Sequence, residues 1–320
     1  MSKTNKTDLI KFEIYSRKNQ VLRHIPMLEH LSKPQKYGKT PILSTEEGRK
    51  LLVDAVLSNK PFMAARFGTS EGAALYEYWK KKIFNGKYNQ KYLNQICTLS
   101  GFFPCNTNKI YDWAELETSC CSDLDLLGYM NFVGEEWIYK TFCPQAKIMP
   151  AGGLSSASKG WTWVLENKKV LVIHPFTDTI KSQYENNREK IFPGSNSLPV
   201  FDLKCVKAVQ TIADAHDSRF ADWFEALDYM ADEASKIDFD VALIGCGAYG
   251  FPLASYIKEM GKTAIHMGGS LQTLFGIKGG RWNVKYNNMY NDAWVYPTEA
   301  ETPAGFEKVE GGCYWNNESK

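Results

Sequence analysis

A glycine-rich stretch between two apolar runs constrains this 320-residue chain more than any other part of its sequence. Residues 240–282 read DVALIGCGAYGFPLASYIKEMGKTAIHMGGSLQTLFGIKGGRW. The short apolar run at 241–244 is typical of a strand buried on both faces, and Pro252 suits the first turn of a helix. A second apolar run at 263–267 predicts another strand, so we expect a βαβ unit. Ligands of such units bind at the carboxyl ends of the strands.

The turn of this unit carries glycines with the spacing G-x-G-x-x-G, namely Gly245, Gly247 and Gly250. Such glycines let the backbone approach a ligand, and free N–H groups at a helix start favour a phosphate. A dinucleotide-binding unit also needs an acidic residue at the end of its second strand. Here that strand ends in His266, Met267 and two glycines. The turn therefore predicts phosphate or nucleotide contact, with glycines that serve only as tight turns as the alternative.

Composition and charge limit what the chain as a whole is expected to bind. The 38 basic and 36 acidic residues nearly balance, which gives no bulk electrostatic case for binding nucleic acid or an anionic membrane. No apolar run reaches the length of a transmembrane helix, and the first residues lack the apolar segment of a signal peptide. We therefore expect a cytoplasmic protein, compatible with a homo-oligomer, whose eight cysteines are reduced thiols.

The order of apolar runs and helical patterns predicts the fold class. About six predicted strands alternate with helices, which indicates an α/β protein with a Rossmann-like, doubly wound and mostly parallel sheet. We expect residues 1–43 to form a helical N-terminal extension, residues 44–285 the Rossmann-like domain, and residues 286–320 an irregular C-terminal extension. Residues 8–31 have helical spacing, and residues 76–130 read as helix interrupted by two turns.

The first predicted strand of the domain ends in chemically useful residues. Arg66 and Gly68 close the strand, Thr69 and Ser70 begin the next helix, and Glu71 lies in its first turn. Ligands of open α/β sheets bind at this kind of position, so we interpret the group as a candidate site. In the alternative interpretation, Glu71 only complements the helix dipole and Arg66 pairs with it.

Two further segments carry candidate functional side chains. The clearest central strand ends at His174, where a neutral imidazole can donate to a phosphate or act as a base near pH 7, although a purely structural histidine is the alternative. Lys278 and Arg281 lie beside three glycines and are candidate phosphate ligands. Trp282 offers an aromatic face on which a base or a sugar can stack.

Four segments of the chain match motifs of one known family. They are residues 66–71 (RFGTSE), residues 170–176 (VLVIHPF), residues 240–250, and a last set comprising His266, Met267, Gly268, Gly269, Gln272, Phe275, Gly276, Arg281 and Trp282. Between residues 45 and 285 the chain resembles the GT-D type glycosyltransferases of bacterial surface-polysaccharide loci. The resemblance implies a Rossmann-like fold and an enzyme of polysaccharide biosynthesis that moves a sugar from a nucleotide-sugar donor to a glycan acceptor.

The resemblance also implies roles for individual residues. An R-F-G-D-G-E stretch of that family supplies two acids for donor and metal binding; here Thr69 replaces the first acid and Glu71 keeps the second. Glu71 or His174 then acts as the catalytic base, and Glu71 is a weak ligand for Mn²⁺ or Mg²⁺, which usually share several carboxylates and phosphates. Together with Lys278, which is expected from its glycine neighbours, the resemblance gives as substrate-binding residues Arg66, Gly68, Thr69, Ser70, Gly245, Gly247, Tyr249, Gly250, His266, Gly268, Gly269, Gln272, Arg281 and Trp282.

Two other functions fit the sequence. The glycine spacing is compatible with an NAD(P)-dependent Rossmann oxidoreductase, although the missing acid opposes it. The loss of an acid at Thr69 is compatible with a non-catalytic protein that binds a nucleotide or a sugar within a glycan assembly complex.

Overall fold

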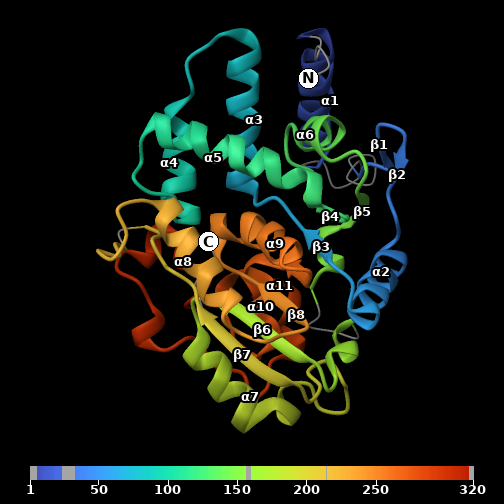
Figure 1. The fold of residues 1–320 in the computed structure, drawn as a ribbon, viewed down its shortest axis with the longest axis vertical. Coiled ribbons are helices and arrows are strands. Elements are labelled where there is room, and N and C mark those ends of the chain that lie inside the picture. Colours follow the sequence, from blue (N-terminus) through green and yellow to red (C-terminus); the bar gives the residue numbers. More distant parts are fainter. Residues whose placement is uncertain (1–5, 24–32, 156–159, 214, 317–320) are drawn as a thin grey trace.

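A seven-stranded, all-parallel sheet forms the centre of the protein (Figure 1). The structure is a computed structural model that describes residues 6–23, 33–155, 160–213 and 215–316. The strands lie in the order β5-β4-β3-β9-β8-β6-β7. Their bounds are β3 (Phe62–Ala65), β4 (Leu126–Tyr129), β5 (Lys147–Pro150), β6 (Lys169–His174), β7 (Asp202–Lys207), β8 (Val241–Ile244) and β9 (Thr263–His266). This arrangement confirms the predicted α/β class and the Rossmann-like, doubly wound sheet.

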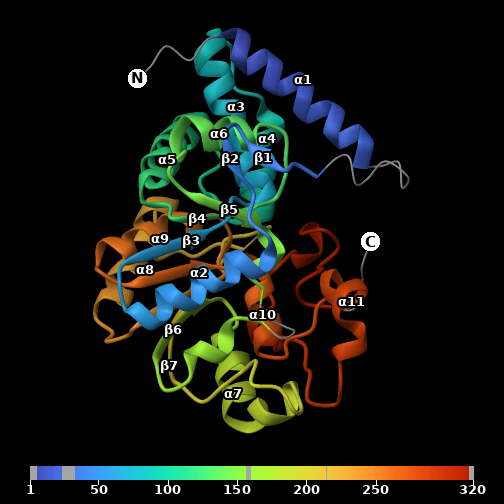
Figure 2. The same ribbon diagram turned by 90° about the vertical axis from the view of Figure 1, so that its right-hand side faces the viewer.

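Helices cover the sheet on both faces (Figures 1 and 2). Their bounds are α1 (Lys6–Arg23), α2 (Thr45–Ser58), α3 (Thr69–Phe84), α4 (Gln90–Ser100), α5 (Thr107–Cys120), α6 (Glu135–Phe142), α7 (Thr177–Ile191), α8 (Trp223–Ser235), α9 (Gly250–Glu259), α10 (Leu271–Leu274) and α11 (Gly280–Tyr286). A small antiparallel pair, β1 (Lys36–Tyr37) and β2 (Thr40–Pro41), lies apart from the sheet. Within the described residues, none of the helices combines the length and the apolar character needed to cross a membrane.

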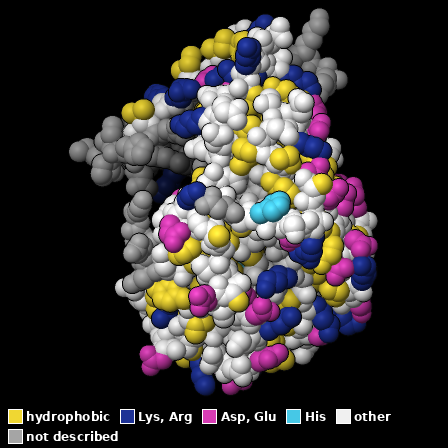
Figure 3. Space-filling view, turned by 90° about the vertical axis from the view of Figure 1, so that its left-hand side faces the viewer, with side chains coloured by type: hydrophobic (Ala, Val, Ile, Leu, Met, Phe, Trp, Pro, Cys, Tyr) yellow, Lys and Arg dark blue, Asp and Glu magenta, His cyan; other side chains and the backbone are white. Residues whose placement is uncertain are grey.

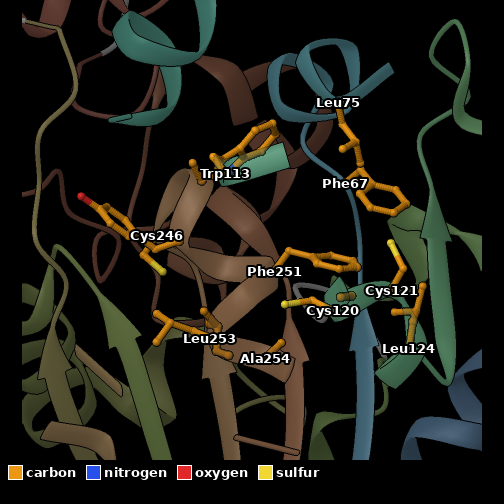
Figure 4. Packing of buried hydrophobic residues seen from close by; sticks show 14 of the residues in the cluster. Phe67, Leu75, Trp113, Cys120, Cys121, Leu124, Cys246, Phe251, Leu253 and Ala254 are labelled. Atoms are coloured by element: carbon orange, nitrogen blue, oxygen red, sulfur yellow. The ribbon is translucent and has the colours of Figure 1, made fainter. Parts of the chain in front are cut away.

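The central strands are buried on both faces because their side chains alternate between two hydrophobic cores. In β6, Leu171 and Ile173 enter the core beneath α3, α5, α8 and α9, whereas Val170 and Val172 enter the core beneath α2, α7 and α10. Within the first core, the rings of Phe67 and Phe251 stack with their centroids 4.7 Å apart (Figure 4). The continuous apolar run in the sequence therefore correctly predicted a strand that is covered by helices on both faces.

The order of the strands creates a crevice at their carboxyl ends. Strands β6 and β8 are neighbours, but the chain leaves β6 towards β7 on one side and leaves β8 towards β9 on the other. The connections that follow these two strands diverge, and an opening forms between them. This topological switch point lies at the ends of the two strands that carry His174 and the G-x-G-x-x-G turn.

The structure corrects two expectations drawn from the sequence. The stretch 76–130 is not helical throughout, because its last part forms strand β4 between β3 and β5. The run LLGY is too short for its pattern to distinguish a strand from a buried helical turn. Its pairing with β3 on one side and β5 on the other makes it a strand. The cysteines are not all reduced thiols, because Cys97 and Cys105 form a disulfide that joins α4 to the loop after it. The other six cysteines are free, and residues 24–31 of the predicted first helix lie outside the described residues.

The C-terminal segment is attached to the sheet layer by a buried carboxylate. Glu301, which is 2% exposed, accepts hydrogen bonds from the backbone N–H groups of Asp178 (2.9 Å) and Thr179 (3.2 Å) at the start of α7, and from the Thr179 hydroxyl. Phe176, the cap residue of α7, contributes no side-chain hydrogen bond of its own. A residue more than a hundred positions away therefore caps this helix and complements its dipole.

We predict that Glu301→Ala lowers the free energy of unfolding by about 2 kcal/mol, because buried N–H donors at the start of α7 lose their acceptor. Glu299→Ala, an exposed carboxylate in the same short turn, is the matched control and leaves stability nearly unchanged. Urea unfolding measures both variants. Equal stability of the two variants would contradict a capping role for Glu301.

Candidate functional site

A cavity of about 730 Å³ lies over the carboxyl ends of the strands. Every strand of the sheet contributes to its lining through its last residue or the residues directly after it. In the order of the sheet these contacts include Ala151, Met130, Arg66, His266, Gly245, His174 and Ala208. Helix α4, helix α11 and residues 309–315 form the walls. The cavity thus occupies the place that the parallel sheet and its switch point prepare for a ligand.

Two glycines allow the floor of the cavity to form. A Cβ atom on Gly245 would lie 2.7 Å from the backbone oxygen of Gly268, so only glycine lets the turns after β8 and β9 approach each other this closely. Gly268 adopts φ +61°, and a Cβ atom there would lie 2.2 Å from Nη2 of Arg66. The missing side chain leaves room for the guanidinium above the turn. The two glycine motifs therefore serve close backbone packing and the placement of Arg66.

Arg66 is a cation without a carboxylate partner among the described residues. Its Nη1 atom approaches the sulfur of Met130 at 3.6 Å, and no ion pair with Glu71 forms. The alternative in which Arg66 only pairs with Glu71 therefore does not describe this structure. An arginine held at a cavity floor by packing presents its planar donors to an anionic ligand.

The first turn of α3 brings a carboxylate and several backbone donors to the cavity. Gly68 is the cap residue of the helix and supplies no side-chain acceptor, so the first N–H groups have no cap from that residue. Glu71 accepts a hydrogen bond from the Ser70 hydroxyl at 2.9 Å, and Ser70 also pairs with Ser100 at 2.7 Å. Behind Glu71, burial and then the charge of Glu71 raise the pKa of Glu117 well above its usual range. Glu71 is thus positioned by a hydroxyl pair at the cavity wall.

His174 is a buried neutral imidazole whose tautomer is determined by the backbone. Its Nδ1 atom accepts the N–H of Phe176 at 3.0 Å, and burial lowers the pKa of His174 to about 3. The proton of the neutral ring therefore resides on Nε2. Of the two roles predicted for His174, this arrangement favours a hydrogen-bond donor over a base, because neither nitrogen is free to accept a proton.

His266 is the second buried imidazole of the floor. Burial, and then the positive charge of Arg66, lower the pKa of His266 to about 3, and its Nδ1 atom lies 3.3 Å from the backbone oxygen of Ile244. A Cβ atom on Gly250 would lie 2.1 Å from the ring, so the missing side chain of this glycine leaves room for His266. Both histidines therefore remain uncharged near neutral pH and leave Arg66 as the cation of the floor.

The structure places most of the sequence-predicted residues around this one cavity. The residues that line it are Arg66, Gly68, Thr69, Ser70, Glu71, His174, Gly245, Gly247, Tyr249, His266, Gly268, Gly269, Gln272, Arg281 and Trp282. Gly250 and Lys278 do not line it; the ammonium of Lys278 lies over the rings of Tyr290 and Tyr296. These residues come from segments more than two hundred positions apart in the chain.

Two of the lining residues are already engaged with the C-terminal segment. Arg281 forms an ion pair with Glu310 at 2.6 Å and donates to the hydroxyl of Tyr314. The amide nitrogen of Gln272 donates to backbone oxygens, including those of Lys278 at 2.9 Å and Tyr314 at 3.2 Å. These contacts hold the C-terminal wall of the cavity. The sequence assigned both residues to ligand binding and gave no sign of this structural use.

Sequence reasoning missed two of the three walls of the cavity, although it predicted Arg281 and Trp282 of the α11 wall. Helix α4 contributes Lys91, Tyr92 and Gln95, and the C-terminal segment contributes Glu310 and Tyr314. No local pattern marks these residues, since they follow no predicted strand and become neighbours only through helix packing. Gln210 and Thr211 also line the cavity, and they were discoverable because they follow β7 closely.

Comparison with known proteins identifies no close relative. No known protein family matches the chain, and no curated protein matches it. Among solved structures, the chain is similar to a protein described as "Selenomethionine substituted structure of domain of unknown function 1792 (DUF1792)". The two are 12% identical, the match covers 85% of this chain and 91% of the other, and the TM-score is 0.40. A likeness this distant supports no conclusion about function.

We predict that the protein loses stability as the pH falls from 6.5 towards 5. The folded pKa values of His174 and His266 are about 3, far below the unfolded value near 6.5, so the unfolded chain binds protons first. Each histidine then costs about 2 kcal/mol at pH 5. Urea unfolding at several pH values should show a smaller loss for His174→Gln than for the parent protein. An identical pH dependence of the two proteins would contradict a buried neutral His174.

Proposed function

We propose that this chain is a glycosyltransferase that moves a sugar from a nucleotide-sugar donor to a glycan acceptor, in bacterial polysaccharide biosynthesis. The observation that carries the proposal is one cavity at the strand ends, in which the Arg66 guanidinium, the first turn of α3 and two glycine turns lie beside the Glu71 carboxylate. A dianionic leaving group needs cations and backbone donors, and an acceptor hydroxyl needs a base. The cavity offers both kinds of group.

The donor diphosphate would lie over the glycine turns after β3, β8 and β9. Arg66 would neutralise it, and the backbone N–H groups at the start of α3 would donate to its oxygens. The Nε2–H group of His174 adds an uncharged donor at the end of β6. Trp282 supplies an aromatic surface at the α11 wall for the base or the sugar.

Glu71 would act as the base in the transfer step. The acceptor hydroxyl gives its proton to the Glu71 carboxylate while its oxygen attacks the anomeric carbon of the donor sugar. A new glycosidic bond forms, and the bond between that carbon and the diphosphate oxygen breaks. The negative charge that develops on the diphosphate is stabilised by Arg66 and by the α3 donors. Glu71 suits this role because the Ser70 hydroxyl, itself paired with Ser100, orients it.

The cavity offers few protein ligands for a divalent metal ion. Within the described part of the chain, no group of three or more His, Cys, Asp or Glu side chains is placed to hold a metal. Glu310, the other carboxylate of the lining, pairs with Arg281. An Mn²⁺ or Mg²⁺ ion beside Glu71 would therefore take its remaining ligands from the diphosphate and from water.

A non-catalytic nucleotide- or sugar-binding protein is the second candidate function. The observation that favours it is Thr69, which stands where the resembling family has an acid and which lines the cavity without a charge. Turnover distinguishes the two functions, because both predict binding. An NAD(P) oxidoreductase is less well supported, since β9 ends in the neutral His266 where a ribose-binding acid is needed.

A thermal-shift screen of nucleotides and nucleotide sugars, with EDTA and with Mn²⁺, tests the proposal first. A ligand that binds only the folded protein raises its Tm according to its saturation. We expect one nucleotide sugar to stabilise the protein and its sugar to be transferred or hydrolysed. Binding without turnover would favour the non-catalytic function, and stabilisation by NAD(P) alone would contradict both.

We predict that Glu71→Gln lowers the turnover of that nucleotide sugar by about a hundredfold or more, because the amide cannot accept the acceptor's proton. The thermal shift caused by the donor should persist, since the side chain keeps its size and its contact with Ser70. Glu46→Gln, an exposed carboxylate in the first turn of α2, is the control and retains full turnover. Undiminished turnover of Glu71→Gln would exclude this residue as the base.

We predict that Arg66→Gln weakens donor binding by about tenfold or more, because the diphosphate loses its cation. The decrease should be measured as a higher donor concentration for half-maximal thermal shift. Arg188→Gln, a change on α7 outside the cavity, provides the control. If the free nucleoside and the nucleotide sugar lose equal affinity in Arg66→Gln, the residue does not contact the phosphates.

A further inference from the structure

Helix α1 presents an apolar stripe to solvent. Ile10, Ile14 and Val21 are 48%, 65% and 63% exposed. Their spacing of four and seven residues places them on one face of the helix. The opposite face attaches the helix to the protein, because Leu9 is fully buried and Phe12 packs on the same core beside α3 and α6. This exposed apolar row is a candidate interaction surface.

Cations flank the stripe along both sides. Lys11 and Lys18 are seven residues apart on one side, and Lys6 and Arg17 are eleven apart on the other; all four are exposed. Glu13, on the same helix, pairs with Arg17 and with Lys80, each at 2.8 Å, so Arg17 shares its charge with this carboxylate while Lys11 and Lys18 are exposed cations beside the stripe. An apolar row between two rows of cations is the pattern of a helix that lies in a membrane interface, where the long cationic side chains reach the headgroups.

The charged residues are distributed unevenly along the chain, and the N-terminal part, which contains α1, is the positive one. Residues 1–100 contain 18 Lys and Arg against 8 Asp and Glu, whereas residues 101–320 contain 20 against 28. The near balance of the whole chain therefore hides a positive first third and a negative remainder. Figure 3 shows dark blue Lys and Arg beside yellow hydrophobic side chains at the upper end of the molecule, whereas dark blue and magenta side chains are mixed lower down. This end is also where α1 lies (Figure 2).

We propose that α1 docks the protein on an anionic lipid surface, with Ile10, Ile14 and Val21 inserted at the level of the headgroups. Charge complementarity selects this occupant. A second copy of the chain would bring its own rows of cations against these, and like charges in contact oppose association. The phosphates of a nucleic acid could pair with the cations, but a nucleic acid has no apolar layer in which the stripe could be buried. Anionic headgroups above acyl chains satisfy both parts of the surface.

Docking through α1 would place the cavity close to the lipid. Helix α1 packs on α3, which packs on α4, and α4 supplies Lys91 and Tyr92 to the cavity wall. An acceptor carried by a lipid would then reach Glu71 without leaving the surface. Access of a lipid-borne acceptor to Glu71 rests on the proposed function, whereas docking of α1 on lipid does not. The glycosyltransferase proposal and the docking proposal can therefore fail separately, each in its own experiment.

Co-sedimentation of the full chain with lipid vesicles tests the proposal. The probes are vesicles of phosphatidylcholine alone and vesicles of equal parts phosphatidylcholine and phosphatidylglycerol, at low and high salt. We expect sedimentation with the anionic vesicles only, and less of it at high salt because screening weakens the cation contacts. No sedimentation with anionic vesicles, or equal sedimentation with both kinds, would overturn the proposal.

Two sets of variants assign the binding to α1. The triple change Ile10→Ser, Ile14→Ser and Val21→Ser should reduce vesicle binding by about tenfold or more. Its matched controls, Val200→Ser and Val284→Ser, replace exposed valines on other segments, which are 53% and 95% exposed, and should bind as the parent does. Parent-like binding of the triple variant would refute insertion of the stripe.

The second set keeps the test valid if the triple variant unfolds α1, which circular dichroism would reveal. Lys11→Glu with Lys18→Glu retains every apolar residue and should also reduce binding by about tenfold. The paired control is Lys181→Glu with Lys190→Glu, two exposed lysines on α7. Sedimentation velocity completes the set: a dimer that the triple variant dissociates would assign the stripe to a second copy and contradict lipid docking.

Discussion

The burial of a parallel sheet on both faces is the constraint on which the rest of this structure depends. Strands β6 and β8 contribute residues to two separate cores, and their four paired positions from 170 to 173 and from 241 to 244 are almost fully buried. A ligand cannot approach such strands through their faces. Because all seven strands run in the same direction, their carboxyl ends meet in one layer. The cavity forms there, and every strand reaches it.

The electrostatic design of the cavity follows from this burial. The two histidines at the strand ends are dehydrated and uncharged near neutral pH, so they add hydrogen-bonding groups without adding charge. Arg66 remains as the cation of the floor, held above a glycine turn that leaves room for it. An ionic contact in such a partly dehydrated place is stronger than the same contact in water. The floor therefore suits an anionic ligand, and the Glu71 carboxylate at the wall suits a neutral hydroxyl.

Much of this arrangement was predictable because it arises from local patterns. Apolar runs located the central strands, the strand-end rule located Arg66, Glu71 and His174, and glycine spacing located the turn at Gly245. The two predictions that were wrong, a helical stretch at 76–130 and eight reduced cysteines, failed for physical reasons. Strand β4 is too short for its pattern to identify it, and its pairing with β3 and β5 decides its conformation. The link between Cys97 and Cys105 depends on the turn after α4, which sequence spacing does not reveal.

The sequence by itself determined the class of the fold and the kinds of residue at the strand ends, because burial periodicity and glycine spacing are local properties. Tertiary structure alone decided which of those residues share a cavity. It placed Lys278 over aromatic rings, Gly250 behind His266, and Gln272 and Arg281 against the C-terminal wall. It also chose the tautomer of His174 through one backbone hydrogen bond. Such outcomes depend on packing between distant segments, which no local pattern contains.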